Sequence, residues 1–347
     1  MPDRRPAGRG GLRRHRTRHG EEDPMRILIW HVHGSWTTSF VQGDHEYLVP
    51  VLPDRGPDGR GRAQTWDWPA SVSELDPGQL RDQAADGGID VVILQRAHEV
   101  DLLREWTGLR AGVDVPAVYV EHDTPREHAA GSRHPMADQD RVPVIHVTRF
   151  NRMMWDCGSA RTGVVEHGIV DPGRSWTGED ASLAVVVNEP VRRGRIAGTD
   201  LVVDLGRQVP LHVYGMGMDE LAELAPHLAP TLHENPPQAE LHRTLGRHRA
   251  YFHPYRWTSL GLALLEAMTL GMPVLALSTT EAPHAVPPEA GLLSNDPHEL
   301  LARARDWLHD RDAAAAAGAA ARDHALRHYG LGRFLADWDT VLQEVTT

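Results

Sequence analysis

The chain has 347 residues, of which 41% are hydrophobic and 24% are charged, which is enough for two domains that each bury a core. Its formal net charge of −12 argues against a protein that binds nucleic-acid phosphates, because that affinity comes from lysine and arginine. We therefore expect a small-molecule ligand. Cys157 is the only cysteine, which excludes an intramolecular disulfide and favours a cytoplasmic protein.

The N-terminal segment differs from the rest of the chain. Residues 1–24 are rich in arginine, glycine and histidine and lack apolar periodicity, which predicts a disordered tail. Met25 directly precedes the first apolar run and is a candidate translation start, the alternative being a functional basic arm. No apolar run approaches the roughly 20 residues of a membrane-spanning helix, and peripheral membrane contact stays open.

The region from residue 25 to residue 171 predicts a first α/β domain. Short apolar runs alternate with helix-like segments such as 80–85 and 100–109, a pattern that indicates an open parallel sheet covered by helices. Residues 54–77 are rich in glycine, proline, aspartate and tryptophan, and their length predicts a binding loop or lid. The expected strands are 27–32, 47–52, 91–94, 117–120 and 144–147.

A second alternating series follows a linker expected at 172–181. It predicts a second doubly wound domain over 182–328. The last segment, 329–347, contains an amphipathic helix expected at 334–345. The expected strands are 183–187, 211–214, 250–253 and 274–277, and the expected helices include 219–228, 238–245, 299–308 and 312–328.

Residues 257–277 predict a loop, a helix and a buried strand in succession. Thr258 and Ser259 are hydroxyl residues of the kind that cap helices, and Gly271 ends the apolar run. The free amides and the positive dipole end of such a helix favour a phosphate. Glu266 lies in this otherwise apolar helix, where a carboxylate costs desolvation unless it has a partner. It is therefore either solvated on an exposed face or held for a ligand.

Two such domains, with TSLGLALLEAMTLGMPVLAL late in the second, resemble the GT-B glycosyltransferases. The specific resemblance is to the large family four of retaining enzymes that use nucleotide sugars. In that family an E-x7-E motif marks the donor site, and here Glu266 takes the second glutamate position and Thr258 the first. The resemblance implies two Rossmann-like domains that face a central cleft. It also implies that the helix of 329–347 packs back on the first domain.

The same resemblance assigns the donor site. VEHGIVD at 165–171 and VYGMGM at 213–218 are similar to two further family segments. The family's second glutamate holds the ribose hydroxyls, which gives that role to Glu266. Its basic pair corresponds to Asn188 and Arg193, and Arg193 would neutralise the leaving diphosphate. The implied donor contacts are Asn188, Arg192, Gly215, Thr258, Ser259, Leu260, Gly261 and Glu266, and the loop 233–237 is expected near the base.

The transferred sugar and the acceptor have their own candidates. His122, in VYVEHDTP at a predicted strand end, matches a histidine that the family places over the donor sugar, the alternative being a loop histidine that caps its neighbours. Gly34 and Ser35 follow the first strand, where the fold brings acceptor and donor together, although a turn with solvated histidines fits there too. Trp36, Trp66 and Trp68 are candidates for stacking on a sugar, or else packing residues. Arg96 is a candidate for an anionic acceptor, or else a surface salt bridge.

The resemblance implies no metal and no cofactor. Arg193 and the helix amides would neutralise the leaving group, and the donor phosphate would take the acceptor proton with retention of configuration. Two D-x-D strings, at 138–140 and 337–339, are candidate metal ligands by residue type. They are expected in a loop and on the terminal helix, and such strings are common by chance. Because Thr258 and Asn188 replace charged motif residues, a catalytically degenerate nucleotide-sugar-binding or interaction protein is the alternative. A GT-B epimerase or phosphorylase is a third interpretation.

Overall fold

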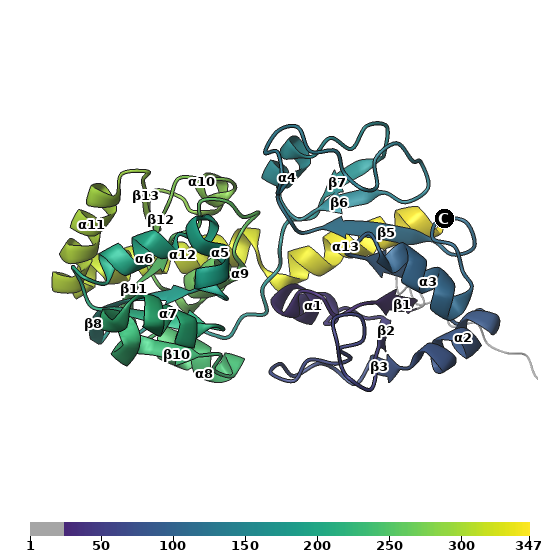
Figure 1. Ribbon diagram of the computed structural model, residues 1–347, viewed down its shortest axis with the longest axis horizontal. Coiled ribbons are helices and arrows are strands. Elements are labelled where there is room, and N and C mark those ends of the chain that lie inside the picture. Colours follow the sequence, from purple (N-terminus) through teal and green to yellow (C-terminus); the bar gives the residue numbers. More distant parts are fainter. Residues whose placement is uncertain (1–23) are drawn as a thin grey trace, which may run out of the picture.

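The computed structural model describes residues 24–347 and consists of two α/β halves side by side (Figure 1). Except for Pro24, the tail predicted at 1–24 lies outside the described residues. The first half contains a seven-stranded parallel sheet with the order β3-β2-β1-β4-β5-β6-β7. The order reverses between β1 and β4, and such a switch point opens a crevice at the carboxyl ends of the strands. The strands are β1 (Arg26–Ile29), β2 (Glu46–Pro50), β3 (Val72–Leu75), β4 (Val91–Leu94), β5 (Ala117–Glu121), β6 (Val144–His146) and β7 (Thr162–Val164).

Helices cover both faces of the first sheet. On one face α2 and α3 supply Leu80, Leu103 and Trp106 to the core, and on the other α1 supplies Trp36 and Phe40. One expectation was wrong here, because β3 lies inside the predicted loop 54–77. Helix α1 begins at Gly34, so the alternative of a turn with solvated histidines does not describe Gly34 and Ser35. The helices are α1 (Gly34–Phe40), α2 (Pro77–Ala85), α3 (Glu99–Thr107) and α4 (Arg149–Met154).

The second half contains a six-stranded parallel sheet with the order β10-β9-β8-β11-β12-β13. All three residues of β12 are buried, as its uninterrupted apolar sequence predicts for a central parallel strand. Strand β8 begins at Asp180, so the linker predicted at 172–181 is two residues too long. The strands are β8 (Asp180–Val186), β9 (Leu211–Gly215), β10 (Leu232–Glu234), β11 (His248–His253), β12 (Val274–Ala276) and β13 (Gly291–Leu293).

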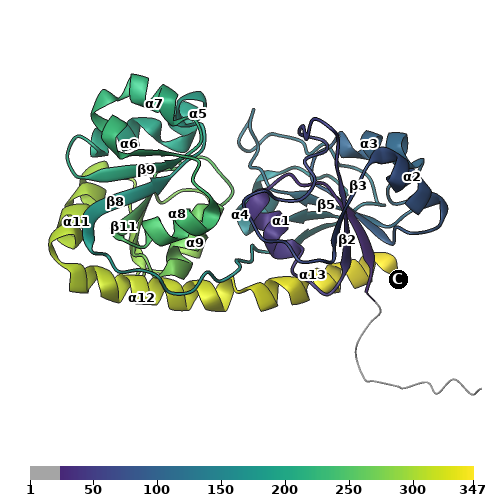
Figure 2. The same cartoon turned by 90° about the horizontal axis from the view of Figure 1, so that it is seen from below.

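The helices of this half form two layers around the sheet. In Figure 2 α5, α6 and α7 lie on one side and α9, α11 and α12 on the other. The helix predicted at 219–228 divides into α7 and a 3-10 turn at Pro226–Thr231. The helices are α5 (Pro190–Ala197), α6 (Thr199–Leu205), α7 (Met218–Leu224), α8 (Gln238–Leu245), α9 (Leu262–Leu270), α10 (Ala282–Ala285), α11 (Pro297–His309) and α12 (Arg311–His328).

Helix α9 starts later than the sequence predicts. Its N-cap is Gly261 and no side chain caps it, so the prediction that Thr258 and Ser259 cap this helix was wrong. Tertiary contacts explain the difference, because the backbone N–H of Arg256 donates to Ile196 and the indole of Trp257 donates across the domains to Pro125. The C-terminal end is as predicted, with Gly271 in the left-handed conformation (φ 94°).

The last helix, α13 (Leu331–Thr346), crosses from the second half to the first, as the resemblance implies. Figure 2 shows α12 and α13 running along one side of both halves. Phe334, Trp338 and Leu342 are buried in the first-domain core, where Trp338 packs edge-on against Trp36 and Phe40. Each such burial contributes about 1.5–3 kcal/mol, so α13 is an integral part of that domain. Within residues 24–347 no helix has the length and apolar character that crossing a membrane requires.

Candidate active site

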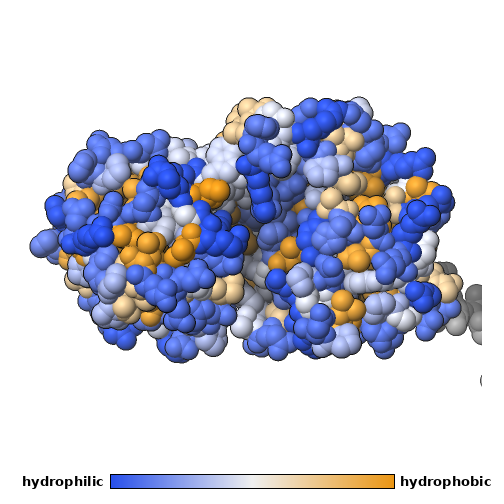
Figure 3. Space-filling model, viewed as in Figure 1, coloured by the Kyte–Doolittle hydropathy of each residue, from blue (hydrophilic) through white to orange (hydrophobic). Residues whose placement is uncertain are grey.

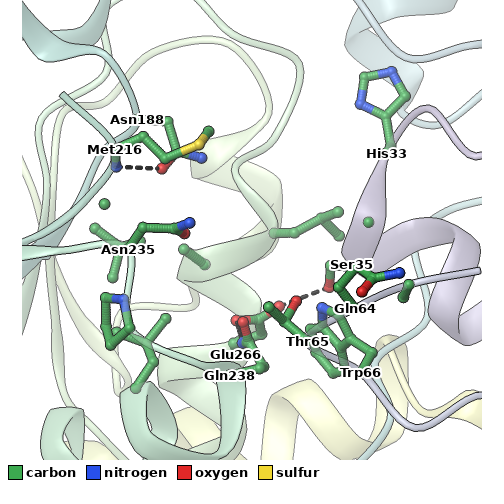
Figure 4. A pocket seen from close by; sticks show the side chains of 18 of the residues that line it. His33, Ser35, Gln64, Thr65, Trp66, Asn188, Met216, Asn235, Gln238 and Glu266 are labelled. Atoms are coloured by element: carbon green, nitrogen blue, oxygen red, sulfur yellow. Dashed lines mark hydrogen bonds between the residues drawn. The ribbon is translucent and has the colours of Figure 1, made fainter. Parts of the chain in front are cut away.

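The strongest candidate site is a cavity of about 600 Å³ between the two halves. A hollow separates the halves in the space-filling view of Figure 3, and Figure 4 shows the cavity from close by. One wall comes from the first domain, from residues after β1 and from the loop 55–66. The other comes from second-domain segments that follow β8, β9, β10 and β11, together with the start of α9. Both walls therefore lie at the carboxyl ends of parallel strands, where ligands of such sheets bind.

Glu266 lies at the base of this cavity with only 4% of its surface exposed. Its carboxylate accepts hydrogen bonds from Ser35 Oγ (2.6 Å) and Gln238 Nε2 (2.8 Å), and His242 Nε2 lies 3.3 Å away. Burial by itself raises the pKa of Glu266, but the hydrogen bonds and the charge of His242 outweigh burial and leave the pKa below its usual value. Glu266 is thus held as a carboxylate, and the solvated alternative does not apply.

The bond between Ser35 and Glu266 connects the two domains across the cavity. Figure 4 shows Ser35 reaching from α1 toward Glu266 on α9. Ser35 was predicted near the acceptor and Glu266 at the donor, and the structure brings the two together. Gly34, the neighbour of Ser35, also lines the cavity.

The second-domain wall contains two further residues of the predicted donor site. Asn188 follows β8, and its Oδ1 accepts the backbone N–H of Met216 at 3.1 Å. Gly215 ends β9 with φ 141°, and a Cβ there would lie 2.1 Å from the carbonyl oxygen of Val187. Only glycine fits at such a position. The backbone of Gly215 therefore forms the cavity wall at this point.

Arg193 does not line the cavity itself but lies behind its second-domain wall. Its guanidinium lies 5.0 Å from the ring centroid of Tyr255, which lines the cavity, and it forms no ion pair with any of residues 24–347. Neighbouring His253 is buried, and burial together with the charge of Arg193 lowers its pKa to about 3. Near Tyr255 the site therefore has a positive charge without a protein counter-ion.

Several predicted donor residues lie elsewhere. Arg192 is exposed and paired with Glu189. Thr258, Ser259 and Leu260 are not among the residues that line the cavity, whereas Gly261 is. Because α9 begins at Leu262, its unpaired amides are presented by residues 261–263, three positions after the predicted helix start.

The predicted sugar and stacking residues form a layer behind the first-domain wall. His122 is 7% exposed and its ring lies 4.0 Å, between centroids, from that of His33, which does line the cavity. Burial lowers the pKa of both imidazoles, that of His33 to about 4. Trp36 is fully buried against Phe40 and Trp338, so the packing alternative describes it correctly and contact with an acceptor does not.

Arg96 also lies outside the cavity. It binds Asp58 at 2.8 Å and Glu99 at 2.7 Å, and it borders a separate depression next to His122. Two carboxylates therefore neutralise the residue predicted to bind an anionic acceptor, as the salt-bridge alternative anticipated.

Several cavity residues escaped the sequence analysis. The loop 54–77 was predicted to bind a ligand, and its residues 55–66 do line the cavity, but no individual arginine of this loop was singled out. Gln238 and Tyr255 belong to no sequence motif. They are recognised as site residues only because Gln238 donates to Glu266 and Tyr255 lies next to Arg193. The predicted base-contacting loop 233–237 supplies Asn235 and Pro236 to the wall.

The two D-x-D strings lie away from the cavity and are engaged in ion pairs. Asp138 pairs with Arg133, and Asp337 pairs with Arg333. Within the described residues, the group of three potential metal ligands that lie within 4.8 Å of one another is Glu166, Glu281 and His284, which is outside the cavity.

Comparisons with known proteins agree with this architecture. Residues 199–310 match the family model described as Glycosyl transferases group 1. No curated protein sequence matches the chain. Sucrose-phosphate synthase from Thermosynechococcus elongatus superimposes with a TM-score of 0.67 at 12% identity, covering 92% of this chain and 98% of the other. Anabaena HepE in complex with UDP-glucose gives 0.65 at 15% identity, with 92% and 100% covered.

A glycosyltransferase from Rickettsia africae is similar at the same level, with a TM-score of 0.62, 12% identity and coverage of 93% and 99%. These three structures extend over nearly their whole length, so the likeness includes both domains and their arrangement. The chain therefore has the two-domain fold of the GT-B glycosyltransferases, and a region of its second domain is similar to the glycosyl transferases group 1 family model.

Proposed function

We propose that this protein transfers a sugar from a nucleoside diphosphate sugar to an acceptor, with retention of the anomeric configuration and without a metal ion. The observation that carries the proposal is Glu266, a buried carboxylate held in the ionised form at the base of an interdomain cavity. A carboxylate accepts two hydroxyl hydrogens side by side, which suits the two hydroxyls of a ribose. The UDP-glucose complex of Anabaena HepE supports this class of donor.

The remaining parts of the donor fit the same wall. Arg193 and the free amides at the start of α9 supply positive charge and hydrogen-bond donors for the diphosphate. Asn235 follows β10 and presents an amide for the base. The ribose would displace Ser35 from Glu266, since the same carboxylate oxygen cannot serve both equally well.

The chemistry then needs no enzymic nucleophile. The acceptor oxygen attacks the anomeric carbon on the face from which the diphosphate leaves, the bond from that carbon to the diphosphate oxygen breaks, and the acceptor proton passes to the departing phosphate. Arg193 stabilises the charge that develops on the leaving group. His33 faces the reacting sugar as a neutral imidazole, with His122 packed behind it as a positioning residue.

A panel of nucleotide sugars tests the proposal. UDP-, ADP-, GDP- and dTDP-glucose and their N-acetylglucosamine and mannose counterparts would be examined for thermal stabilisation and for slow hydrolysis. We expect one nucleotide to stabilise the protein and its sugar to be released. Stabilisation without turnover, even with acceptor extracts, would instead identify the catalytically degenerate binder. Turnover that requires inorganic phosphate would identify a phosphorylase.

A further inference from the structure

Three arginines from one loop line the first-domain wall of the cavity, and they are held differently. Arg55 donates to both carboxylate oxygens of Glu74, at 2.8 and 3.1 Å. Arg62 donates to the backbone carbonyls of residues 68, 69 and 72. The side chain of Arg60 forms no ion pair or hydrogen bond with any part of the chain that the structure describes. Arg60 is thus the one of these three arginines whose guanidinium has no protein partner among the described residues.

The backbone that carries Arg60 is fixed, although its side chain is exposed. Arg60 forms an antiparallel bridge with Val51 after β2. On either side of it, Leu52 N–H donates to Gly59 at 2.9 Å, and Gly61 N–H donates to Pro50 at 3.0 Å. Such anchoring reduces the entropy lost when the side chain binds a ligand.

The residues that line the cavity around Arg60 include little negative charge. Glu266 is the one carboxylate among the described residues that line the cavity, and its oxygens are already hydrogen-bonded. Burial lowers the pKa of His33, the charge of Asp123 opposes this shift, and the charge of Arg60 adds to it. Burial and the charge of Arg60 also lower the pKa of His31. Arg60 is therefore close to both imidazoles, which are neutral at pH 7.

Two arginines at the cavity that form no ion pair among the described residues, Arg193 and Arg60, belong to different domains and are assigned to different substrates. Arg193 lies behind the second-domain wall, next to Tyr255, whereas Arg60 lines the opposite wall. Arg96, predicted to bind an anionic acceptor, is neutralised by Asp58 and Glu99. We propose that Arg60 binds an anionic group, a phosphate or a carboxylate, on the acceptor. The inference rests on the proposed glycosyl transfer and specifies the class of acceptor.

The neighbours of Arg60 indicate that the rest of this acceptor is a sugar. Gln64 and Thr65 bring an amide and a hydroxyl to the same wall, and Trp66 adds an indole (Figure 4). Amide and hydroxyl groups bind sugar hydroxyls, and an indole ring covers the apolar face of a sugar. The acceptor is thus a phosphorylated or acidic sugar whose anionic group only anchors it, while a free hydroxyl of the same sugar attacks the donor.

Acceptor binding by calorimetry, in the presence of 1 mM UDP, tests the inference on the full chain. The probes are glucose, glucose 6-phosphate, fructose 6-phosphate and glucuronate, which separate a phosphate from a carboxylate. We expect one of the anionic sugars to bind at least tenfold more tightly than glucose. Arg60→Gln should reduce that affinity roughly 10- to 100-fold, because a hydrogen bond to a charged group contributes about 1.5–3 kcal/mol.

Two further variants complete the design. Arg60→Lys keeps the charge and should lose less affinity than Arg60→Gln. Arg305→Gln is the matched control, since Arg305 is an exposed arginine on α11 outside the cavity and without an ion pair among residues 24–347. Equal affinity of wild type and Arg60→Gln for every anionic sugar would overturn the inference. So would a protein that binds none of them better than glucose.

Failure of this inference can be told apart from failure of the proposed function. If the wild type binds a nucleoside diphosphate and releases the sugar while Arg60→Gln changes nothing, only the acceptor assignment fails. If no nucleotide sugar is bound or consumed, the proposed function fails, whatever the affinity for anionic sugars.

Discussion

Replacing Glu266 by glutamine tests the ribose assignment with little change in shape. The side chain keeps its size, and its remaining carbonyl oxygen still accepts one hydrogen bond. Truncation to alanine would be less informative, because it would leave Ser35, Gln238 and His242 without their common partner inside the protein. The glutamine variant therefore separates the loss of a ligand contact from the loss of the fold.

The expected loss follows from the hydrogen bonds involved. A carboxylate accepts both ribose hydroxyls with charge assistance, whereas the amide accepts one without it. The difference is about 1.5–3 kcal/mol, which corresponds to roughly 10- to 100-fold weaker binding of the nucleoside diphosphate. The same variant should unfold within a few degrees of the wild type, since the buried volume is unchanged.

Calorimetric titration with UDP, ADP and GDP measures this effect, and thermal unfolding controls for the fold. Ser35→Ala is an informative companion variant, because Ser35 Oγ donates a hydrogen bond to Glu266 at 2.6 Å and would compete with a ribose hydroxyl. Removing that competitor should tighten nucleotide binding about two- to tenfold. Unchanged nucleotide affinity in Glu266→Gln, in a folded protein, would refute the ribose assignment.

Further predictions concern the walls of the cavity. Gly215→Ala should lower the unfolding free energy by about 2 kcal/mol or more in denaturant titration, because its Cβ would lie 2.1 Å from a backbone oxygen at φ 141°. Gly34→Ala is the control and should fold normally, since no atom lies closer than 3.9 Å to the added Cβ. Equal stabilities of the two variants would contradict the packing argument. Arg193→Gln should weaken a nucleoside diphosphate about tenfold but leave the nucleoside unchanged in calorimetry, and an equal effect on both would remove Arg193 from the diphosphate site. Because the pKa of Glu266 lies below the 4.5 of an ordinary glutamate, its carboxylate persists as the pH falls. The affinity for the nucleoside, which has no titrating phosphate, should therefore stay level from about pH 8 to pH 5 and decline below. A midpoint near pH 6.5 would point to a histidine instead.

Much of the fold could be predicted from the sequence because both sheets are parallel and buried. Strand β4 coincides with the predicted run 91–94, and α8 coincides with 238–245. The amphipathic pattern of the last helix and its return to the first domain were likewise confirmed. The edge strands β3, β7, β10 and β13 were missed, since edge strands are short and only partly apolar and resemble loops in sequence.

The site was harder to predict because its partners are distant in the chain. Ser35 and Glu266 are 231 residues apart, and no local pattern announces their contact. Arg96 and Arg60 look alike in the sequence, and only the positions of Asp58 and Glu99 show that Arg96 is neutralised. The start of α9 was misplaced for a related reason, since contacts of Arg256 and Trp257 with other segments override the capping preference of Thr258 and Ser259.

The central claim is sugar transfer with retention, and proton NMR of the reaction tests it most directly. Each nucleotide sugar of the panel, in which UDP, ADP, GDP or dTDP carries glucose, N-acetylglucosamine or mannose, would be incubated with the wild type and with glucose 6-phosphate, another anionic sugar or an acceptor extract. Glu266→Gln is the comparison. Our account predicts that the anomeric signal of one donor disappears, a nucleoside diphosphate accumulates, and the product keeps the α configuration, all more slowly in the variant. A product of the β configuration, or no consumption of any donor, would contradict it.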